Sequence, residues 1–319
     1  MSQPEIVVIA KLPDLHMAHL EKNFTCHKLY EAEDREAFLA QHRDTARGVV
    51  TNGLRGFKAD IIEALPNLEI ISVWGAGLQA LDLEAARRHG IFVTNTPDNS
   101  KIAVAELGIA LMLNVGRRIM EADKFVKSGA WASGSFTGYG SGFYEKKLGI
   151  VALGTIGRAV AERAASFGMK ISYFGPNEKS DVPYTYTYNI VDLARNSDFL
   201  MLCCPETPET TGLITSGVLE ALGPEGVLIN ISRGVVVDEN ALIDALKSGV
   251  IKGAGLDVFV DEPNVPDDLR NLENVVLMPH IGTATADVRR IRMEMTVTNL
   301  QDYFNGKPLS SALVEGKSS

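Results

Sequence analysis

The histidine best placed to do chemistry is His280, in the segment Met278-Pro279-His280-Ile281-Gly282 at the carboxyl end of a predicted strand. Ligands of open α/β sheets bind beyond the carboxyl ends of the strands. An imidazole titrates near neutrality and can give or take a proton during a reaction. His280 is therefore a candidate acid or base, although a structural histidine is the more frequent occupant of such a position.

The other histidines carry weaker signals. His16 and His19 could share a helix face as metal ligands, but no Cys, Asp or Glu pattern accompanies them, and a surface pair is favoured. His27, His42 and His89 have no sequence context that indicates chemistry. We therefore predict no metal site.

A glycine-containing turn could bind a pyrophosphate. The predicted strand Leu148 to Leu153 leads into Gly154-Thr155-Ile156-Gly157 and then into the helical run Arg158 to Phe167, which Gly168 would end. Phosphates approach the backbone at such a turn and face the helix N–H groups, so side chains there must be small or absent. Ala152 stands where G-x-G-x-x-G has its first glycine, so an ordinary strand-to-helix turn is the alternative.

The tip of the next strand bears on the choice between NAD and NADP. An NAD site usually presents a carboxylate to the ribose hydroxyl about 20 residues after the glycines. This strand tip has none, whereas Asn177, Lys179 and Ser180 could hold a 2′-phosphate. The sequence favours NADP(H). In the alternative, Glu178 turns back to the ribose, Lys179 is solvated and NAD(H) is bound.

Short β-branched runs alternate with helical stretches, which predicts an α/β fold with parallel sheets. The first series of strands would form one small sheet, and the second series, of six strands, would form a dinucleotide-binding sheet. The expected strands are Glu5 to Ala10, Arg47 to Val50, Glu69 to Val73 and Gly90 to Thr94, then Leu148 to Leu153, Met169 to Phe174, Asp198 to Cys203, Gly226 to Ile231, Gly253 to Val258 and Asn274 to Met278.

Three further segments complete the predicted organisation. Val104 to Lys127 has the pattern of one long helix that bridges the domains, and Asp287 to Phe304 is a later helix. Ser128 to Gly142 is rich in Gly and Ser, but Trp131, Phe136 and Tyr139 lie in it and Phe143 follows it. A covered or partner-contacting loop and a solvated loop are therefore both open. The polar tail Glu315 to Ser319 is expected to be disordered.

Composition excludes several classes of protein. The 319 residues are 45% hydrophobic and 22% charged, as in ordinary soluble proteins. The net charge of −9 and the lack of a basic cluster argue against nucleic acid as a partner. Cys26, Cys203 and Cys204 form no disulfide pattern, and the neighbouring pair is best explained as packed thiols. With no targeting signal or membrane span evident, we expect a cytoplasmic protein.

Beyond these signals, nearly the whole chain resembles the D-2-hydroxyacid dehydrogenases, and most of all their glyoxylate and hydroxypyruvate reductase branch. The matching segments are Thr94-Asn95-Thr96-Pro97-Asp98, Val104-Ala105-Glu106-Leu107, Leu148 to Gly157, Pro205 to Thr211, Asn230-Ile231-Ser232-Arg233-Gly234, Gly255-Leu256-Asp257-Val258-Phe259, Asp261-Glu262-Pro263 and Pro279-His280-Ile281-Gly282. The resemblance implies a flavodoxin-like substrate domain, residues 1–98 and 287–319, and a Rossmann dinucleotide-binding domain, residues 99–286.

The resemblance also implies a catalytic triad of Arg233, Glu262 and His280. In the reduction of a 2-oxo acid, His280 would protonate the oxygen while hydride arrives from nicotinamide. Glu262 would orient the ring and favour its protonated form, and Arg233 would grip the substrate carboxylate with its planar fork.

Further roles follow from the same matching. Asp257 would face the nicotinamide carboxamide, and the loop Val73 to Gly77 would offer backbone donors to the substrate. The cofactor contacts would be Gly154, Thr155, Ile156, Gly157, Asn177, Lys179, Ser180, Cys204, Pro205, Thr210, Ile231, Ser232, Asp257, Gly282 and Thr283; the substrate contacts would be Trp74, Gly75, Ala76, Gly77, Arg233 and His280. The family pattern also implies a homodimer formed through the cofactor domain, with the loop around Trp131 to Phe143 crossing between subunits.

Some residues depart from the family pattern. Gln79 and Lys101 differ from the usual types, and Lys101 could bind a second anionic group or be a solvated helix-end lysine. Trp74 could line the pocket or pack in the core. A nicotinamide-sensing, corepressor-like protein with little turnover is the alternative function.

Overall fold

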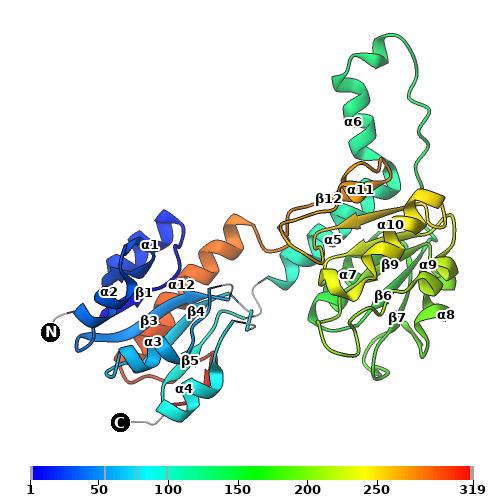
Figure 1. Ribbon diagram of the computed structural model, residues 1–319. Coiled ribbons are helices and arrows are strands. Elements are labelled where there is room, and N and C mark those ends of the chain that lie inside the picture. The colour runs from blue at the N-terminus through cyan, green and yellow to red at the C-terminus, as the bar shows by residue number, and fades with distance from the viewer. Residues whose placement is uncertain (1–2, 54, 76, 79, 98–99, 317–319) are drawn as a thin grey trace. The chain divides into compact units, whose positions relative to one another are not determined.

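The computed structural model describes residues 3–53, 55–75, 77–78, 80–97 and 100–316 (Figure 1). Contacts between Cα atoms divide the chain into two compact units. The first contains Met1–Asn99 and Ala286–Ser319, and the second contains Ser100–Thr285. The two units are considered one at a time below.

The described part of the first unit contains a six-stranded sheet in the order β13-β5-β4-β3-β1-β2. All neighbouring strands are parallel except β13 and β5. The strands are β1 (Glu5–Val8), β2 (Thr25–Lys28), β3 (Ala46–Asn52), β4 (Ile70–Trp74), β5 (Phe92–Thr94) and β13 (Ala312–Val314). The helices are α1 (Asp14–Glu21), α2 (Arg35–Gln41), α3 (Ala59–Ala64), α4 (Leu83–His89) and α12 (Ala286–Phe304), with the 3-10 turn η1 (Leu29–Glu31).

Alternating apolar residues bury both faces of this sheet. Val7, Val49 and Ile71 pack on one face with residues of α2, α3 and α4. Ile6 and Ile70 pack on the other face with residues of α1 and α12. Successive side chains of a strand point to opposite faces, so each strand contributes to both cores.

The prediction of four strands for this sheet was too low. β2 was missed because its sequence, Thr-Cys-His-Lys, has no apolar run, and β13 was missed because it has only three residues and lies near the tail. Val314 of β13 is nevertheless buried.

The described part of the second unit contains a seven-stranded parallel sheet in the order β12-β11-β10-β9-β6-β7-β8. The strands are β6 (Lys147–Val151), β7 (Lys170–Phe174), β8 (Thr185–Thr187), β9 (Phe199–Leu202), β10 (Val227–Asn230), β11 (Gly253–Leu256) and β12 (Val275–Leu277). The helices are α5 (Lys101–Arg117), α6 (Ile119–Lys127), α7 (Thr155–Ser166), α8 (Ile190–Arg195), α9 (Ser216–Leu222), α10 (Glu239–Ser248) and α11 (Asp267–Arg270), with the 3-10 turns η2 (Ala130–Ala132) and η3 (Gly234–Val236).

The sheet topology sets where a ligand can bind. The chain runs outward through β6, β7 and β8 and then returns to place β9 on the other side of β6. Such a reversal opens a crevice beyond the carboxyl ends of the central strands. The prediction of six strands omitted β8, whose short Thr-Tyr-Thr sequence gives little signal.

The predicted long helix is two helices. It breaks at Arg118, whose φ of +53° is left-handed, and its guanidinium then binds the Glu121 carboxylate at the start of α6. Beyond the break, α6 and η2 project from the sheet of this unit (Figure 1). Within this arm, residues 119–142, Trp131 is 65% and Tyr139 90% exposed.

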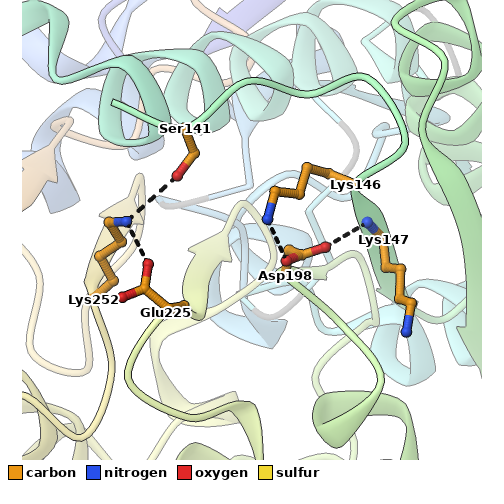
Figure 2. Close-up of polar contacts among 6 residues, drawn as sticks. All are labelled: Ser141, Lys146, Lys147, Asp198, Glu225 and Lys252. Carbon is orange, nitrogen blue, oxygen red and sulfur yellow. Dashed lines mark hydrogen bonds and ion pairs between the residues drawn. The ribbon is translucent and has the colours of Figure 1, made fainter. Parts of the chain in front are cut away.

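Polar contacts fix Ser141, near the end of the arm, and the segment that follows the arm to the sheet (Figure 2). The Asp198 carboxylate, just before β9, accepts hydrogen bonds from Lys146 Nζ at 2.9 Å and Lys147 N at 2.8 Å. Beside it, Lys252 Nζ lies 2.7 Å from Glu225 Oε2 and 3.4 Å from Ser141 Oγ. The chain therefore returns from the arm to a fixed place at the amino ends of the strands.

Within the described parts of the chain, every helix is too short or too polar to cross a bilayer.

Candidate active site

The predicted pyrophosphate turn lies at the topological reversal of the second unit. Gly154 is the N-cap of α7, and no side chain caps this helix end. A Cβ built on Gly154 would meet no atom within 4 Å, whereas one on Gly157 would lie 2.3 Å from Ala152 O. Gly154 thus leaves open space before the helix N–H groups, and Gly157 allows α7 to pack against the end of β6. This arrangement fits a dinucleotide phosphate.

The alanine in the first glycine position keeps the backbone of a glycine. Ala152 has φ of +72°, in the left-handed region that L residues avoid. Its N–H donates to Phe174 O at 2.8 Å, which joins the ends of β6 and β7. The departure from the fingerprint therefore adds backbone strain and leaves the shape of the turn intact.

The tip of β7 is shaped by tyrosines. The Tyr173 hydroxyl accepts a hydrogen bond from Lys179 N at 2.6 Å, and Tyr186 Oη donates to Gly175 O at 2.8 Å. Asn177, Glu178 and Ser180 are exposed on the folded-back loop, and Lys179 is half-buried. The loop is thus a defined turn with its polar side chains outward.

A further carboxylate near this tip was overlooked in the sequence. Asp181 forms an ion pair with Arg158 of α7, with Oδ2 2.9 Å from Nη1. The hydrogen bond from Arg158 lowers the pKa of Asp181. The Asp181 charge is therefore already matched by a guanidinium at the amino end of α7.

The loops that follow β9 and β10 contain the next predicted cofactor contacts. After β9, Thr210 Oγ1 donates to Pro205 O at 2.7 Å and closes the loop. Cys204 is buried, as packing of this thiol predicts, and burial raises its pKa. Ile231 and Ser232, after β10, are also buried. Any contact of Cys204 with a cofactor would therefore involve its backbone.

The predicted triad residues follow three neighbouring parallel strands. Arg233 comes after β10, Glu262 after β11 and His280 after β12, so all three leave the same edge of the sheet. His280 Nδ1 lies 2.7 Å from Glu262 Oε2. The other carboxylate oxygen of Glu262 accepts from Phe259 N at 3.0 Å. The Phe259 N–H therefore fixes the Glu262 carboxylate through one oxygen, and the other oxygen fixes the His280 ring.

Close backbone packing keeps the Arg233 and Glu262 loops together. A Cβ on Gly234 would lie 2.0 Å from Phe259 C and O. Asn230, buried at the end of β10, donates from Nδ2 to Arg233 O at 3.0 Å and accepts from Ser232 N at 2.9 Å. Arg233 is exposed, with Nη1 2.7 Å from Ser232 O. Sequence reasoning did not assign this anchoring role to Asn230.

Asp257 shapes the segment after His280. Its Oδ1 accepts from Ile281 N at 2.7 Å and its Oδ2 from Gly282 N at 2.9 Å. Burial raises the pKa of Asp257, although these two N–H groups oppose the shift. His280 itself has φ of +52°, and its N–H donates to Asp257 O at 2.9 Å. Asp257 thus fixes a constrained turn; its predicted contact with nicotinamide stays a prediction.

The predicted substrate loop belongs to the first unit. Gly75, with φ of +120°, donates its N–H to Thr96 Oγ1 at 2.9 Å, so this donor is already used. Ala76 and Gln79 lie outside the described residues. Trp74 packs edge-on against His16 with ring centroids 5.4 Å apart. Lys101 is exposed as the first residue of α5 in the second unit.

The expectation for His16 was wrong. It is 4% exposed, and its Nε2 lies 2.9 Å from Arg289 O, so it is a core residue and no member of a surface pair. His27 and His42, which had no sequence context, form a stacked pair with ring centroids 3.7 Å apart.

Comparison with known proteins identifies the class to which this fold and site belong. Residues 109–282 match the family model described as "D-isomer specific 2-hydroxyacid dehydrogenase, NAD binding domain". The chain belongs to the D-isomer specific 2-hydroxyacid dehydrogenases, and the second unit contains a nicotinamide dinucleotide-binding domain. The expected fold class is confirmed.

Individual relatives place the chain in the glyoxylate/hydroxypyruvate reductase branch. It is 48% identical to hydroxyphenylpyruvate reductase of Plectranthus scutellarioides and 44% identical to glyoxylate/hydroxypyruvate reductase A of Arabidopsis thaliana, in each case over 92% of this chain and 94% of the relative.

Solved structures agree with this placement. A 2-hydroxyacid dehydrogenase from Ketogulonicigenium vulgare has a TM-score of 0.95 and 42% identity, over 99% of this chain and 100% of that chain. The NADPH-dependent glyoxylate/hydroxypyruvate reductase of Sinorhizobium meliloti, solved with NADP and malonate, has a TM-score of 0.87 and 34% identity over 100% of both chains. These relatives do not favour the nicotinamide-sensing alternative.

Proposed function

We propose that this protein reduces a small 2-oxo acid of the glyoxylate or hydroxypyruvate type to the D-2-hydroxy acid. The observation that carries the proposal is the 2.7 Å contact between His280 Nδ1 and Glu262 Oε2 at a strand edge that also bears Arg233. Relatives named for reduction of 2-oxo acids support it.

The residues divide the work of the reaction. The nicotinamide cofactor, when bound, supplies the hydride. Glu262 accepts the Nδ1–H of His280 and so directs Nε2 outward, where a protonated ring can donate to the developing alkoxide. Arg233 offers the exposed guanidinium that binds the substrate carboxylate in a bidentate manner. The Val73 to Gly77 loop is the proposed second carboxylate contact.

NADP(H) is the proposed preferred cofactor. Asn177, Lys179 and Ser180 surround the β7 tip with polar groups of neutral or positive charge, and the nearby Asp181 carboxylate is paired with Arg158. The Asp181 charge would therefore repel a 2′-phosphate little, and Glu178, exposed in the same loop, is the carboxylate that such a phosphate would have to avoid. One structural relative was solved with NADP.

A homodimer in the cytoplasm is the proposed state. The arm exposes Val126, Trp131 and Tyr139, and apolar surface of this kind marks protein contacts. All three cysteines are free thiols, which suits a reducing compartment. Sedimentation as a monomer would contradict the assembly.

Initial rates provide the test of the activity. Glyoxylate, hydroxypyruvate, pyruvate and 2-oxogluconate are each assayed with NADPH and with NADH, by loss of nicotinamide absorbance. We expect turnover with glyoxylate or hydroxypyruvate and a higher kcat/KM with NADPH. His280→Ala should lower turnover by roughly 10² to 10⁴ with cofactor affinity retained. Nicotinamide binding without turnover would reject the reductase in favour of a sensing role.

A further inference from the structure

Three side chains meet at one edge of the first unit, away from every residue assigned above. Glu5 opens β1, His27 lies in the edge strand β2, and His42 ends α2. The parallel register pairs Val7 with His27, so Glu5 and His27 point from the same face of the sheet. Sequence spacing could not reveal this group because the residues come from three elements.

The three groups are close enough to share one ion. His27 Nε2 lies 2.9 Å from Glu5 Oε2, and the His27 and His42 rings are stacked 3.7 Å apart with an interplanar angle of 24°. One ligand atom from each residue lies within 4.8 Å of the others. Tetrahedral ligands at about 2.1 Å from a metal are about 3.4 Å apart. The three ligand atoms are therefore within reach of one ion once the two rings turn out of their stack, because an imidazole nitrogen binds a metal in the plane of its ring.

The chemistry of the donors selects the ion. Two imidazoles and one carboxylate are ligands of Zn²⁺ and similar divalent transition metals, whereas Mg²⁺ and Ca²⁺ prefer oxygen alone. We propose that Glu5, His27 and His42 bind one divalent transition-metal ion of the Zn²⁺ class. Such an ion would tie the edge strand β2 to β1 and to the end of α2.

Access from solvent is also present. His27 lines a surface hollow together with Glu21, Lys28, Glu31 and Phe38. Lys28 Nζ lies 2.9 Å from Glu21 Oε1, so the charge of this lysine is matched by a carboxylate and would repel an entering metal ion little. The Glu5 side chain is 34% exposed and has room to rotate. The hollow gives an ion access to His27, and the Glu5 side chain can turn to meet it there.

Titration calorimetry of the full chain with ZnSO₄, after treatment with a chelator, tests the proposal. We expect one Zn²⁺ per chain and a Tm rise of roughly 5 °C at a concentration a hundredfold above Kd. Glu5→Gln keeps the side-chain size and removes the charge, and His42→Asn removes one imidazole. Each should weaken binding at least tenfold and so reduce the Tm rise at the same Zn²⁺ concentration by about half or more. His19→Asn, on α1 of the same unit, is the matched control and should bind like the wild type.

Two results would overturn the site. Wild-type protein without Zn²⁺ binding rejects it outright. Equal Zn²⁺ affinity in Glu5→Gln, His42→Asn and the control places the ion elsewhere, for example at His280 and Glu262. His42→Asn could fail to fold, and Glu5→Gln then decides the test alone. Glu5→Gln keeps a hydrogen bond to His27, and circular dichroism checks that it folds.

Discussion

The Asp257 carboxylate holds the main chain directly after His280, with Oδ2 2.9 Å from Gly282 N and Oδ1 2.7 Å from Ile281 N. Gly282 is buried, so its N–H needs an acceptor, and the buried Asp257 carboxylate provides it. The geometry of the proposed acid therefore depends on a neighbouring side chain that does no proton transfer in the proposed reaction.

Asp257→Asn should reduce kcat by about 10². An amide has one oxygen, so its NH₂ group would oppose one of the two N–H donors and displace the His280 turn. A shift of about 1 Å at a catalytic group costs about that factor. Steady-state kinetics compares the kcat of Asp257→Asn with that of Asp261→Asn, which replaces an exposed carboxylate in the same region. Similar kcat values for both variants would contradict the anchoring role.

Glu262→Gln should lower kcat by roughly tenfold or more. The carboxylate fixes the His280 ring through the 2.7 Å contact between Glu262 Oε2 and His280 Nδ1, whereas an amide can present its NH₂ group to Nδ1 and turn the ring. Steady-state kinetics of wild type and variant measures this, and an unchanged kcat would show that Glu262 does not position the proposed acid.

Ala152→Gly should stabilise the protein by about 1 kcal/mol. At φ of +72° the left-handed backbone raises the free energy of the folded state for an alanine, whereas glycine adopts it freely. Ala161→Gly, in the buried interior of α7, is the control and should destabilise by about 1 kcal/mol or more. Urea unfolding gives both values, and destabilisation by Ala152→Gly would refute the strain.

Lys179→Ala should lower kcat/KM with NADPH by about tenfold and change kcat/KM with NADH little. A tenfold loss is about 1.4 kcal/mol, which we assign to the removed contact between the Lys179 ammonium and the 2′-phosphate. Lys247→Ala, a lysine of α10 paired with Asp268, is the control. Equal losses with both cofactors would remove Lys179 from the proposed phosphate site.

The sequence predicted the parts of this molecule whose signal is local. The apolar β-branched runs located four strands of the first sheet and six of the second, and the glycine turn located the amino end of α7. Polar or very short strands, β2, β8 and β13, had no such signal. The break at Arg118 was hidden because a left-handed arginine leaves the helical pattern unchanged.

The candidate site also contains residues with a local sequence signal and residues without one. The motifs shared with the family predicted the triad of His280, Glu262 and Arg233, and in the structure the first two lie 2.7 Å apart. The anchoring roles of Asp257 and Asn230 depend on hydrogen bonds to backbone groups, which no spacing encodes. His27 and His42 meet only because parallel strands and a helix end bring distant residues to one edge.

Asp198→Asn should destabilise the second unit at neutral pH and much less in acid. Burial raises the pKa of this carboxylate, but the hydrogen bonds from Lys147 N and Lys146 Nζ lower it more, and the net pKa lies below its ordinary value of 3.8. A carboxyl whose folded pKa is lowered stabilises the fold above the unfolded value, and that stability is lost as pH falls through the folded pKa. We expect a loss of about 1–2 kcal/mol at pH 7.

The neighbouring ion pair in Figure 2 supplies the control. The Glu225 side chain is 81% exposed beside Lys252, so Glu225→Gln should cost less than about 0.5 kcal/mol at any pH. Urea unfolding at pH 7 and pH 3 measures both variants against wild type. If Asp198→Asn matches Glu225→Gln at pH 7, the Lys146 and Lys147 contacts do not stabilise the return of the arm to β6.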